Sequence, residues 1–304
     1  MGNYYQRIRG TAFFFLYRLK RALRWMGLEK VPGVTRAYRF LKRRFLPDGT
    51  VLVKNGENLL YVDLADEVVT PAVVAKARRE YEMDVYASLL QPGMTVIDVG
   101  ANIGHYAIVA ARRVGERGRV FAFEPEPRNF QLLARNVAVN GLSNVVAEMK
   151  AVADRRESRC LYVSEYNLGS HSLAPENAPD SRRRIEVETV TIDEYHEQEM
   201  DGCRVDLLKV DTQGAEMMIV NGACKLLSGE SIIVVMECWP FGLKRMGSSA
   251  AELVDQLGYL GFDLTIIDER NRSMTSLDPT SLKRMSSLEE EYGSHFALLG
   301  QKRS

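Results

Sequence analysis

Beginning at Met94, short apolar runs alternate with segments of helical periodicity, and this alternation limits the folds open to the chain. Parallel strands joined by right-handed helical crossovers build a sheet with helices on both faces. One stretch, residues 164–186, is rich in Asn, Ser, Pro and Arg and predicts a long loop or hairpin insertion. We therefore predict an α/β fold with a doubly wound, mostly parallel, seven-stranded sheet. Its strands are Met94–Val99, Arg119–Glu124, Asn144–Met149, Val205–Asp211, Ser231–Glu237, Phe262–Ile267 and His295–Leu299.

Residues 47–93 precede this sheet region, which we assign to residues 94–304. Two short apolar runs flank Asn55–Gly56, the pair preferred at the centre of a tight I′ turn, and therefore predict a β-hairpin. A helix over Pro71–Leu90 is predicted to follow and to lead into the sheet. The sheet is thus expected to carry an N-terminal extension of helix and hairpin.

Residues 1–46 form a basic amphipathic extension with twelve Lys or Arg residues and one acid, Glu29. The rest of the chain has 28 basic and 39 acidic residues, so the neutral total hides an asymmetry. Two interpretations stay open. The helix packs its apolar stripe on the protein body, or it attaches the protein peripherally to an anionic membrane surface or a lipid-linked substrate. The stripe consists of Ala12, Leu16, Leu19, Leu23 and Met26.

The cysteines and histidines show no spacing typical of a metal site, so we expect none. The four cysteines contain no CxxC pair and are expected to be free thiols in a reducing compartment. The apolar cluster Thr11–Tyr17 is too short for a secretory signal. We therefore expect a cytoplasmic protein. The residues concerned are Cys160, Cys203, Cys224, Cys238, His105, His171, His196 and His295.

The first predicted strand ends in a glycine turn with the pattern GxNxG, at Gly100, Asn102 and Gly104. A dinucleotide site would need GxGxxG, whose amides and helix N-terminus hold a pyrophosphate. Asp98 lies two residues before Gly100 and would repel a pyrophosphate, but it suits a ligand with an ammonium and a sulfonium group. Glu124 follows the second strand, where a carboxylate can accept both hydroxyls of a ribose. Together these residues predict an S-adenosylmethionine site.

Several longer runs resemble the FkbM-type methyltransferases: VIDVGANIGHY, FAFEPEP, NFQLLARNVAVNG, VTIDEY and LLKVDTQGAE. The resemblance extends over about Tyr81–Ile267 and does not cover residues 1–46. It implies a class I, Rossmann-like methyltransferase that uses S-adenosyl-L-methionine. Members are mostly O-methyltransferases, often of sugars, glycolipids or polyketide scaffolds. The family more often has Glu where this chain has Gln213. The cofactor contacts that the resemblance implies are Asp98, Gly100, Asn102, Gly104 and Glu124.

Three acids are candidates for the acceptor side of the site. Asp211 ends the fourth strand and is our first candidate for orienting or deprotonating an acceptor hydroxyl, with helix capping as the alternative. Glu216 lies on the next helix, where it can instead complement the helix dipole. Glu237 ends the fifth strand, where a solvated acid is the alternative. His171, in the insertion, is a weaker candidate for a base, since a surface loop histidine is the simpler explanation.

The expected acceptor is a small molecule or a glycan or lipid-linked hydroxyl compound. Three other classes were weighed against it. A binding protein without turnover is disfavoured by the intact turn and Glu124. A nucleic-acid methyltransferase is disfavoured because Asp211-Thr212-Gln213-Gly214 offers no proline and no stacking aromatic residue. A nicotinamide oxidoreductase is disfavoured by the glycine turn.

Overall fold

The computed structural model describes residues 15–45, except 17, 21, 24, 29 and 30, and residues 49–74, 81–229, 231–292 and 294–303. The chain forms two compact units. Unit 1 comprises Met1–Arg78 with Tyr166–Leu168, and unit 2 comprises Arg79–Glu165 with Gly169–Ser304. The division between them therefore falls inside the region 47–93, and it leaves the hairpin in unit 1.

Unit 1 contains the helix α2 (Pro32–Phe45), the hairpin strands β1 (Thr50–Asn55) and β2 (Asn58–Asp63), and α3 (Val69–Val74). The hairpin is present, but its turn lies one residue later than predicted. Asn55 pairs with Asn58, so Gly56 and Glu57 are the central residues. Of these two residues only Gly56 has a positive φ, +60°, whereas a I′ turn needs a positive φ at both.

The predicted helix over Pro71–Leu90 corresponds to two described helices. These are α3 in unit 1 and α4 (Tyr81–Leu89) in unit 2. Residues 75–80, in the middle of the predicted helix, lie outside the described residues.

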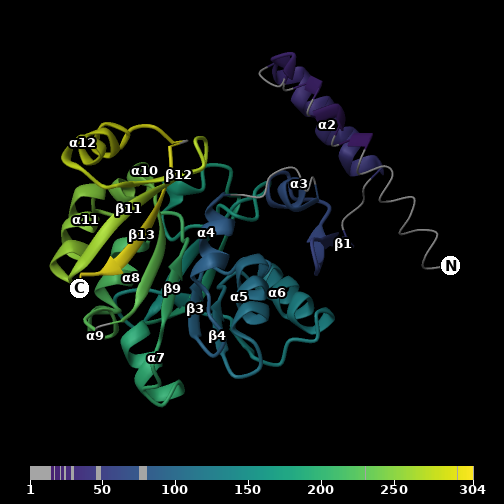
Figure 1. Ribbon diagram of the computed structural model, residues 1–304. Coiled ribbons are helices and arrows are strands. Elements are labelled where there is room, and N and C mark those ends of the chain that lie inside the picture. Colours follow the sequence, from purple (N-terminus) through teal and green to yellow (C-terminus); the bar gives the residue numbers. More distant parts are fainter. Residues whose placement is uncertain are drawn as a thin grey trace. The chain divides into compact units, whose positions relative to one another are not determined.

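Unit 2 is built on an eight-stranded sheet with the order β12-β11-β13-β10-β9-β3-β4-β5 (Figure 1). The strands β10, β9, β3, β4 and β5 are parallel, and β13 runs antiparallel to both β10 and β11. The doubly wound α/β fold is thus confirmed. The strand bounds are β3 (Thr95–Val99), β4 (Arg119–Phe123), β5 (Val145–Glu148), β9 (Leu207–Val210), β10 (Ile233–Cys238), β11 (Phe262–Asp268), β12 (Ser273–Ser276) and β13 (Phe296–Lys302).

All seven predicted strands are present, and the sheet has an eighth, β12. It pairs antiparallel with β11 at the end of the sheet, and three of its four residues are exposed. A strand with so little burial needs no run of apolar residues, so its sequence, SMTS, carries no strand pattern.

Helices lie along both faces of the sheet (Figure 1). In α6 the N-cap carboxylate of Glu126 accepts the N–H of Asn129, and Pro127 occupies the first turn. The helix predicted after β9 is split into α8 and α9. The bounds are α5 (His105–Val114), α6 (Pro127–Val139), α7 (Ile192–Glu199), α8 (Glu216–Asn221), α9 (Cys224–Leu227), α10 (Pro240–Arg245), α11 (Ala250–Tyr259) and α12 (Pro279–Ser287).

The insertion is the long connection of a hairpin. The strands β7 (Ser158–Val163) and β8 (Arg183–Val190) pair antiparallel, and β6 (Ala151–Val152) adds to β8 in parallel. The connection contains one 3-10 turn, η2 (Pro175–Asn177), and a single bridge between Tyr162 and Ser172.

The parallel strands all end at one edge of the sheet, the carboxyl edge, where sheets of this kind bind ligands. Because β13 is antiparallel to β10, the start of β13 lies at this same edge, where Phe296 pairs with Cys238. The carboxyl edge therefore collects the ends of β3, β4, β9 and β10 together with the residues that precede β13.

Candidate active site

The turn between β3 and α5 is held by close backbone packing at Gly100. This residue has a φ of +79°, and a Cβ atom on it would overlap the carbonyl oxygen of Asp211. The N–H of Gly100 also donates to the carbonyl oxygen of Phe123, at 3.0 Å. A glycine is therefore required here for the left-handed backbone and for the approach of the turn to the ends of β9 and β4.

Asn102 and Gly104 continue the turn with φ values of +52° and +89°. The side chain of Asn102 accepts the N–H of Ile103 at 2.8 Å, a local bond that helps an Asn to adopt a left-handed conformation. A Cβ atom on Gly104 would lie 2.6 Å from Cδ1 of Leu133 in α6. The GxNxG pattern thus brings the N-terminus of α5 close to α6 at the carboxyl edge.

Glu124 directly follows β4 and is 4% exposed. Its Oε2 accepts the N–H of Asn102 and its Oε1 accepts the N–H of Glu126, both at 2.9 Å. The side chain of Asn129 also bonds this carboxylate, so one of the four lone pairs on its two oxygens remains for a ligand hydroxyl. Burial raises the pKa of Glu124 to about 8, although the two backbone N–H groups oppose this shift.

Asp98, in β3, is fully buried beside a buried lysine, Lys209 of β9. The ammonium nitrogen of Lys209 lies 3.7 Å from Oδ1 of Asp98 and 3.6 Å from Oδ2 of Asp211. Neither oxygen of Asp98 has a hydrogen-bond partner in the part of the chain that the structure describes. Burial raises the pKa of Asp98, and the nearby Lys209 opposes that shift. Lys209 thus connects Asp98, a predicted cofactor residue, with Asp211, the first candidate for the acceptor side.

Further groups surround the Lys209 ammonium. The ring of Tyr106 lies 4.4 Å from it, at a distance typical of a cation–π contact. The hydroxyl of Tyr106 donates to Oε1 of Glu82 at 3.1 Å. Burial acts to lower the pKa of Lys209, but Asp211, Asp98 and Glu82 outweigh it and raise the pKa. Lys209 is therefore charged.

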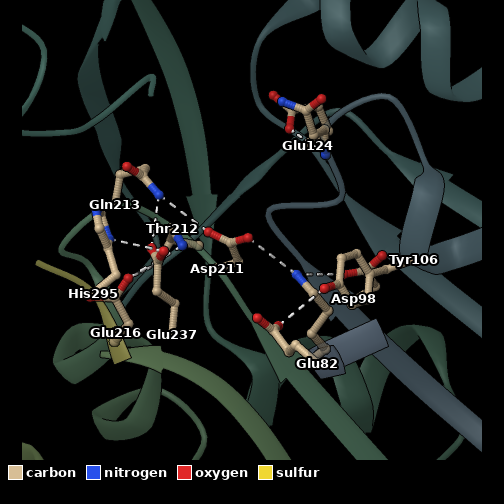
Figure 2. Close-up of polar contacts among 12 residues, drawn as sticks. Glu82, Asp98, Tyr106, Glu124, Asp211, Thr212, Gln213, Glu216, Glu237 and His295 are labelled. Carbon is tan, nitrogen blue, oxygen red and sulfur yellow. Dashed lines mark hydrogen bonds and ion pairs between the residues drawn. The ribbon is translucent and has the colours of Figure 1, made fainter. Parts of the chain in front are cut away.

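Asp211 also belongs to a second group of polar side chains, which we call the edge cluster. Its four members are Asp211, Gln213, Glu237 and His295 (Figure 2). Nε2 of Gln213 donates to Oδ1 of Asp211 at 3.3 Å and to Oε2 of Glu237 at 2.8 Å. Nδ1 of His295 lies 3.0 Å from Oε1 of Glu237. The cluster therefore links the ends of β9 and β10 with the residue that precedes β13.

Two members of the edge cluster have shifted pKa values. Burial, followed by the charge of Asp211, raises the pKa of Glu237 to about 8, while the contact with His295 opposes the shift. Burial acts to lower the pKa of His295, but its contact with Glu237 outweighs burial and raises it. The His295–Glu237 pair therefore titrates as a unit. Asp211, whose side chain is 40% exposed, is the more accessible carboxylate.

Glu216 is fully buried and faces its own turn. Its Oε1 accepts the N–H groups of Thr212 at 3.3 Å and Gly214 at 3.1 Å, and the hydroxyl of Thr212 at 3.2 Å. Burial raises the pKa of Glu216 to about 7. Asp211 does not cap the following helix, because α8 begins after Ala215 without a side-chain cap. The capping alternative for Asp211 is therefore wrong, and Glu216 bonds the N–H groups of this turn instead.

The insertion contacts the same turn. The carbonyl oxygen of Gln213, a residue with a φ of +57°, accepts the Ser172 hydroxyl at 2.9 Å and Nδ2 of Asn177 at 3.0 Å. His171 is not a solvated loop residue, because its Nδ1 accepts the N–H of Ser164 at 3.1 Å. Burial lowers the pKa of His171 to about 4, so the ring is neutral. With Nδ1 already accepting a bond, His171 is a poor candidate for a base.

Two residues of the site were missed in the sequence. Lys209 lies two positions before Asp211. Because side chains alternate between the two faces of a strand, this spacing was a signal that both side chains share one side of the sheet. His295 had no comparable signal. Its place beside Glu237 depends on the antiparallel direction of β13, which strand patterning does not reveal.

The residues present fit S-adenosylmethionine. Asp98 has two buried carboxylate oxygens without a hydrogen-bond partner among the described residues, and an α-ammonium group would supply donors to them. Glu124 keeps an acceptor position for a ribose hydroxyl. The acids around Lys209 give this edge a negative character that suits a sulfonium cation.

Comparisons with known proteins find methyltransferases. The sequence profile of the "Methyltransferase FkbM domain" family matches residues 98–264, and a protein-L-isoaspartate(D-aspartate) O-methyltransferase profile matches residues 23–156. The chain is 27% identical over 143 residues to Methyltransferase 1 of Beauveria bassiana, covering 42% of this chain and 57% of the relative. It is 29% identical over 198 residues to Methyltransferase sdnD of Sordaria araneosa, covering 56% of this chain and 74% of the relative.

Among solved structures, the chain is similar to the methyltransferase FkbM from Methylobacillus flagellatus KT. The TM-score is 0.42 at 12% identity, with 76% of this chain and 52% of that chain covered. The first relative is also matched over little more than half of its length, 57%.

The fold and the site define a class I methyltransferase that uses S-adenosylmethionine as its cofactor. Since the matched profile covers more than half of the sequence, the chain belongs to the FkbM methyltransferase family.

The role proposed for Glu124 can be tested by binding. We expect Glu124→Ala to weaken S-adenosylhomocysteine binding by about 1.5–3 kcal/mol, as for losing hydrogen bonds to a charged group. Because ribose hydroxyls favour the ionised carboxylate, binding to the native protein at pH 7 should also release protons. Calorimetry in buffers of different ionisation enthalpy measures both effects. Glu186→Ala, at an exposed acid of β8, is the control. Unchanged affinity and proton release in Glu124→Ala would remove Glu124 from the site.

Proposed function

We propose that the protein transfers the methyl group of S-adenosylmethionine to a hydroxyl oxygen of a sugar, glycolipid or polyketide-type acceptor. The observation that carries this proposal is the position of the edge cluster. Asp211, an accessible carboxylate, is linked through Lys209 to Asp98, the residue that fits the cofactor's ammonium group. An oxygen acceptor needs a group that takes or orients its proton, and Asp211 stands next to the cofactor residues.

The reaction is an in-line displacement. S-adenosylmethionine supplies an activated methyl group, whose carbon–sulfur bond breaks as the acceptor oxygen forms a bond to carbon. The protein's part is to position both reactants, to exclude water and to accept the hydroxyl proton. We assign cofactor positioning to Asp98, the turn Gly100–Gly104 and Glu124. We assign acceptance of the hydroxyl proton to Asp211. Nε2 of Gln213 donates to Oδ1 of Asp211 and holds this carboxylate in place.

The other two acidic candidates have supporting roles in this proposal. Glu237 orients Gln213 and His295, and Glu216 stabilises the turn that carries Gln213. The insertion residues Ser172 and Asn177, which bond the same turn, would place the insertion beside the acceptor. Loops at this edge commonly carry specificity.

Catalysis should not require a divalent metal ion. No group of three or more His, Cys, Asp or Glu side chains able to hold a metal occurs among the described residues. Lys209 already balances the charge of Asp98 and Asp211. We therefore expect methyl transfer to persist after dialysis against a chelator. Activity that is lost with chelator and restored by magnesium would contradict this expectation.

We propose a cytoplasmic enzyme whose acceptor is a small molecule or a glycan or lipid-linked compound, not a nucleic acid. All four cysteines are free thiols, as expected in a reducing compartment. No aromatic residue follows Asp211 in the turn, and Trp239, which follows β10, is 1% exposed and cannot stack on a base.

Labelled methyl transfer tests the proposal. The full-length protein is incubated with methyl-labelled S-adenosylmethionine and, separately, with lipid-linked glycans, soluble glycans and total RNA. We expect label in a glycan or lipid-linked fraction, in a product whose methyl group survives mild base, as an ether does. Label only in RNA would favour a nucleic-acid methyltransferase. Cofactor binding without transfer to any fraction would favour a binding protein.

A further inference from the structure

Unit 1 exposes an unusual share of large apolar side chains. Of the thirteen large apolar side chains that are exposed among the described residues, seven fall between residues 15 and 41. Trp25 is 89% exposed and Phe40 is 70% exposed. The seven are Phe15, Trp25, Met26, Leu28, Val31, Phe40 and Leu41. Scattered exposed apolar residues are normal, whereas exposed apolar side chains that gather on one face mark an interaction surface.

In helix α2 the exposed side chains lie on one face of the helix, which we call the outer face of α2. Its exposed positions recur at intervals of three and four residues, so they lie on one side of the helix. The outer face combines apolar and basic side chains. Its members are Gly33, Arg36, Ala37, Phe40, Leu41 and Arg44.

The opposite face of α2 is committed to the core of unit 1. Tyr38 is buried in a cluster with Leu16 and Leu64. Lys42 is buried as well, and its ammonium donates to the carbonyl oxygens of Ala65 at 2.7 Å and Asp66 at 2.9 Å. The inner face therefore accounts for the packing of α2, and that packing leaves Phe40 and Leu41 uncovered.

The same packing divides the apolar stripe that the sequence predicts for residues 1–46. Leu16 is 4% exposed, and Leu19 and Leu23 pack against the Leu16–Tyr38–Leu64 cluster. These leucines hold the segment to unit 1 and are not available to a membrane. Met26, in contrast, is 51% exposed. Phe13 and Phe14 lie outside the described residues.

Basic side chains accompany the exposed apolar ones. Arg36 and Arg44 are exposed on the outer face, and Arg18 is exposed nearby in the sequence. Arg39 and Lys20 are held by Glu67, at 3.3 and 3.0 Å, and are not available. Each basic residue near an anionic bilayer strengthens binding, and apolar side chains add burial at the headgroup boundary.

We propose that the outer face of α2, together with Phe15 and Trp25, docks unit 1 on the surface of an anionic phospholipid bilayer. No described helix has the length and apolar character to cross a bilayer, so the contact is peripheral. The combination of aromatic rings, Leu41 and arginines suits a headgroup layer, where rings enter the acyl boundary and guanidinium groups meet phosphates. The proposal is independent of the methyl-transfer chemistry of unit 2.

Trp25 provides the readout. The chain has two tryptophans, and the other, Trp239 of unit 2, is 1% exposed. We expect the full-length protein to sediment with vesicles containing phosphatidylglycerol, to ignore pure phosphatidylcholine vesicles, and to detach in high salt. Binding should shift the emission of Trp25 to shorter wavelength. The shift should disappear in Trp25→Phe.

Two double variants test the named surface. Phe40→Ser with Leu41→Ser, and Arg36→Glu with Arg44→Glu, should each weaken vesicle binding by about tenfold or more. The matched controls are in unit 2. Tyr259→Ser removes a ring that is 87% exposed, and Arg113→Glu with Arg117→Glu makes the same charge change at exposed sites. Both controls should bind vesicles normally.

Several results would overturn the proposal. Equal binding by the α2 variants and the native protein would do so, as would no sedimentation at low salt. A different outcome is self-association of the native protein in the absence of vesicles. If the Phe40 and Leu41 substitutions abolished that self-association, the outer face of α2 would be assigned to a second copy of the chain. Circular dichroism of each variant verifies that it is folded, as expected for substitutions of exposed residues.

Discussion

Asp211→Asn should lower methyl-transfer turnover by about 10²–10⁴-fold while S-adenosylhomocysteine binding largely survives. The substitution keeps the size of the side chain and its contact with Gln213, but it removes the carboxylate that accepts the proton. It also removes one of the two anionic partners of Lys209, which retains Asp98 at 3.7 Å. The loss should therefore appear in turnover and not in folding or cofactor affinity.

The measurement is single-turnover transfer of labelled methyl to the acceptor identified in the glycan and lipid fractions, with calorimetry on the same samples. Asp255→Asn, at an exposed position of α11, is the matched control and should transfer normally. Normal turnover in Asp211→Asn would remove Asp211 as the base. His295 is then the next candidate, because its bond to Glu237 through Nδ1 leaves Nε2 to accept a proton.

Lys209→Met should lower the free energy of unfolding of unit 2 by about 3–5 kcal/mol at pH 7, the usual cost of removing one partner of a buried ion pair. The variant leaves Asp98 fully buried without its counter-charge. The pKa of Asp98 is already raised by burial, and loss of the opposing lysine raises it further. A raised carboxyl pKa favours the folded state at low pH and disfavours it as the pH rises. The deficit should therefore be smaller near pH 5 than at pH 8.

Denaturant unfolding followed by tryptophan fluorescence measures this effect. In a Trp25→Phe background, Trp239 is the remaining tryptophan and reports on unit 2. The control is Lys225→Met, which removes an exposed lysine paired with Glu197 at 2.8 Å, and no measurable change is expected. Equal stability of Lys209→Met and the native protein at pH 7 would show that Asp98 does not depend on the lysine.

The core of unit 2 could be predicted from sequence because the central parallel strands β3, β4, β9 and β10 are largely buried on both faces. The strand β10, for example, reads IVVMEC, an apolar run interrupted only by Glu237, its next-to-last residue. The strand β12 escaped prediction because it is largely exposed. The hairpin turn was misplaced by one residue because Asn55 and Gly56 resemble a I′ pair, whereas the strand register placed Gly56 and Glu57 at the centre.

The residues proposed for the cofactor side could be grouped from sequence because they are close in sequence to the glycine turn. Asp98, Gly100 and Glu124 each end or follow a strand of successive βα units. The acceptor side could not be resolved in the same way. Whether Glu216 faces the acceptor or its own turn depends on side-chain direction, and His295 reaches Glu237 only through the antiparallel strand β13. The first is a local choice of side-chain direction and the second depends on long-range topology, and sequence patterning reveals neither.

We expect the edge formed by Asp98, the Gly100–Gly104 turn and Glu124 to hold S-adenosylmethionine and not a dinucleotide. Calorimetric titration of the native full-length protein with S-adenosylhomocysteine tests this claim directly, because it needs no acceptor. NAD and NADP are titrated in parallel. We predict saturable binding of S-adenosylhomocysteine at one site per chain and no heat from either dinucleotide. Binding of NAD or NADP, with none of S-adenosylhomocysteine, would contradict the account.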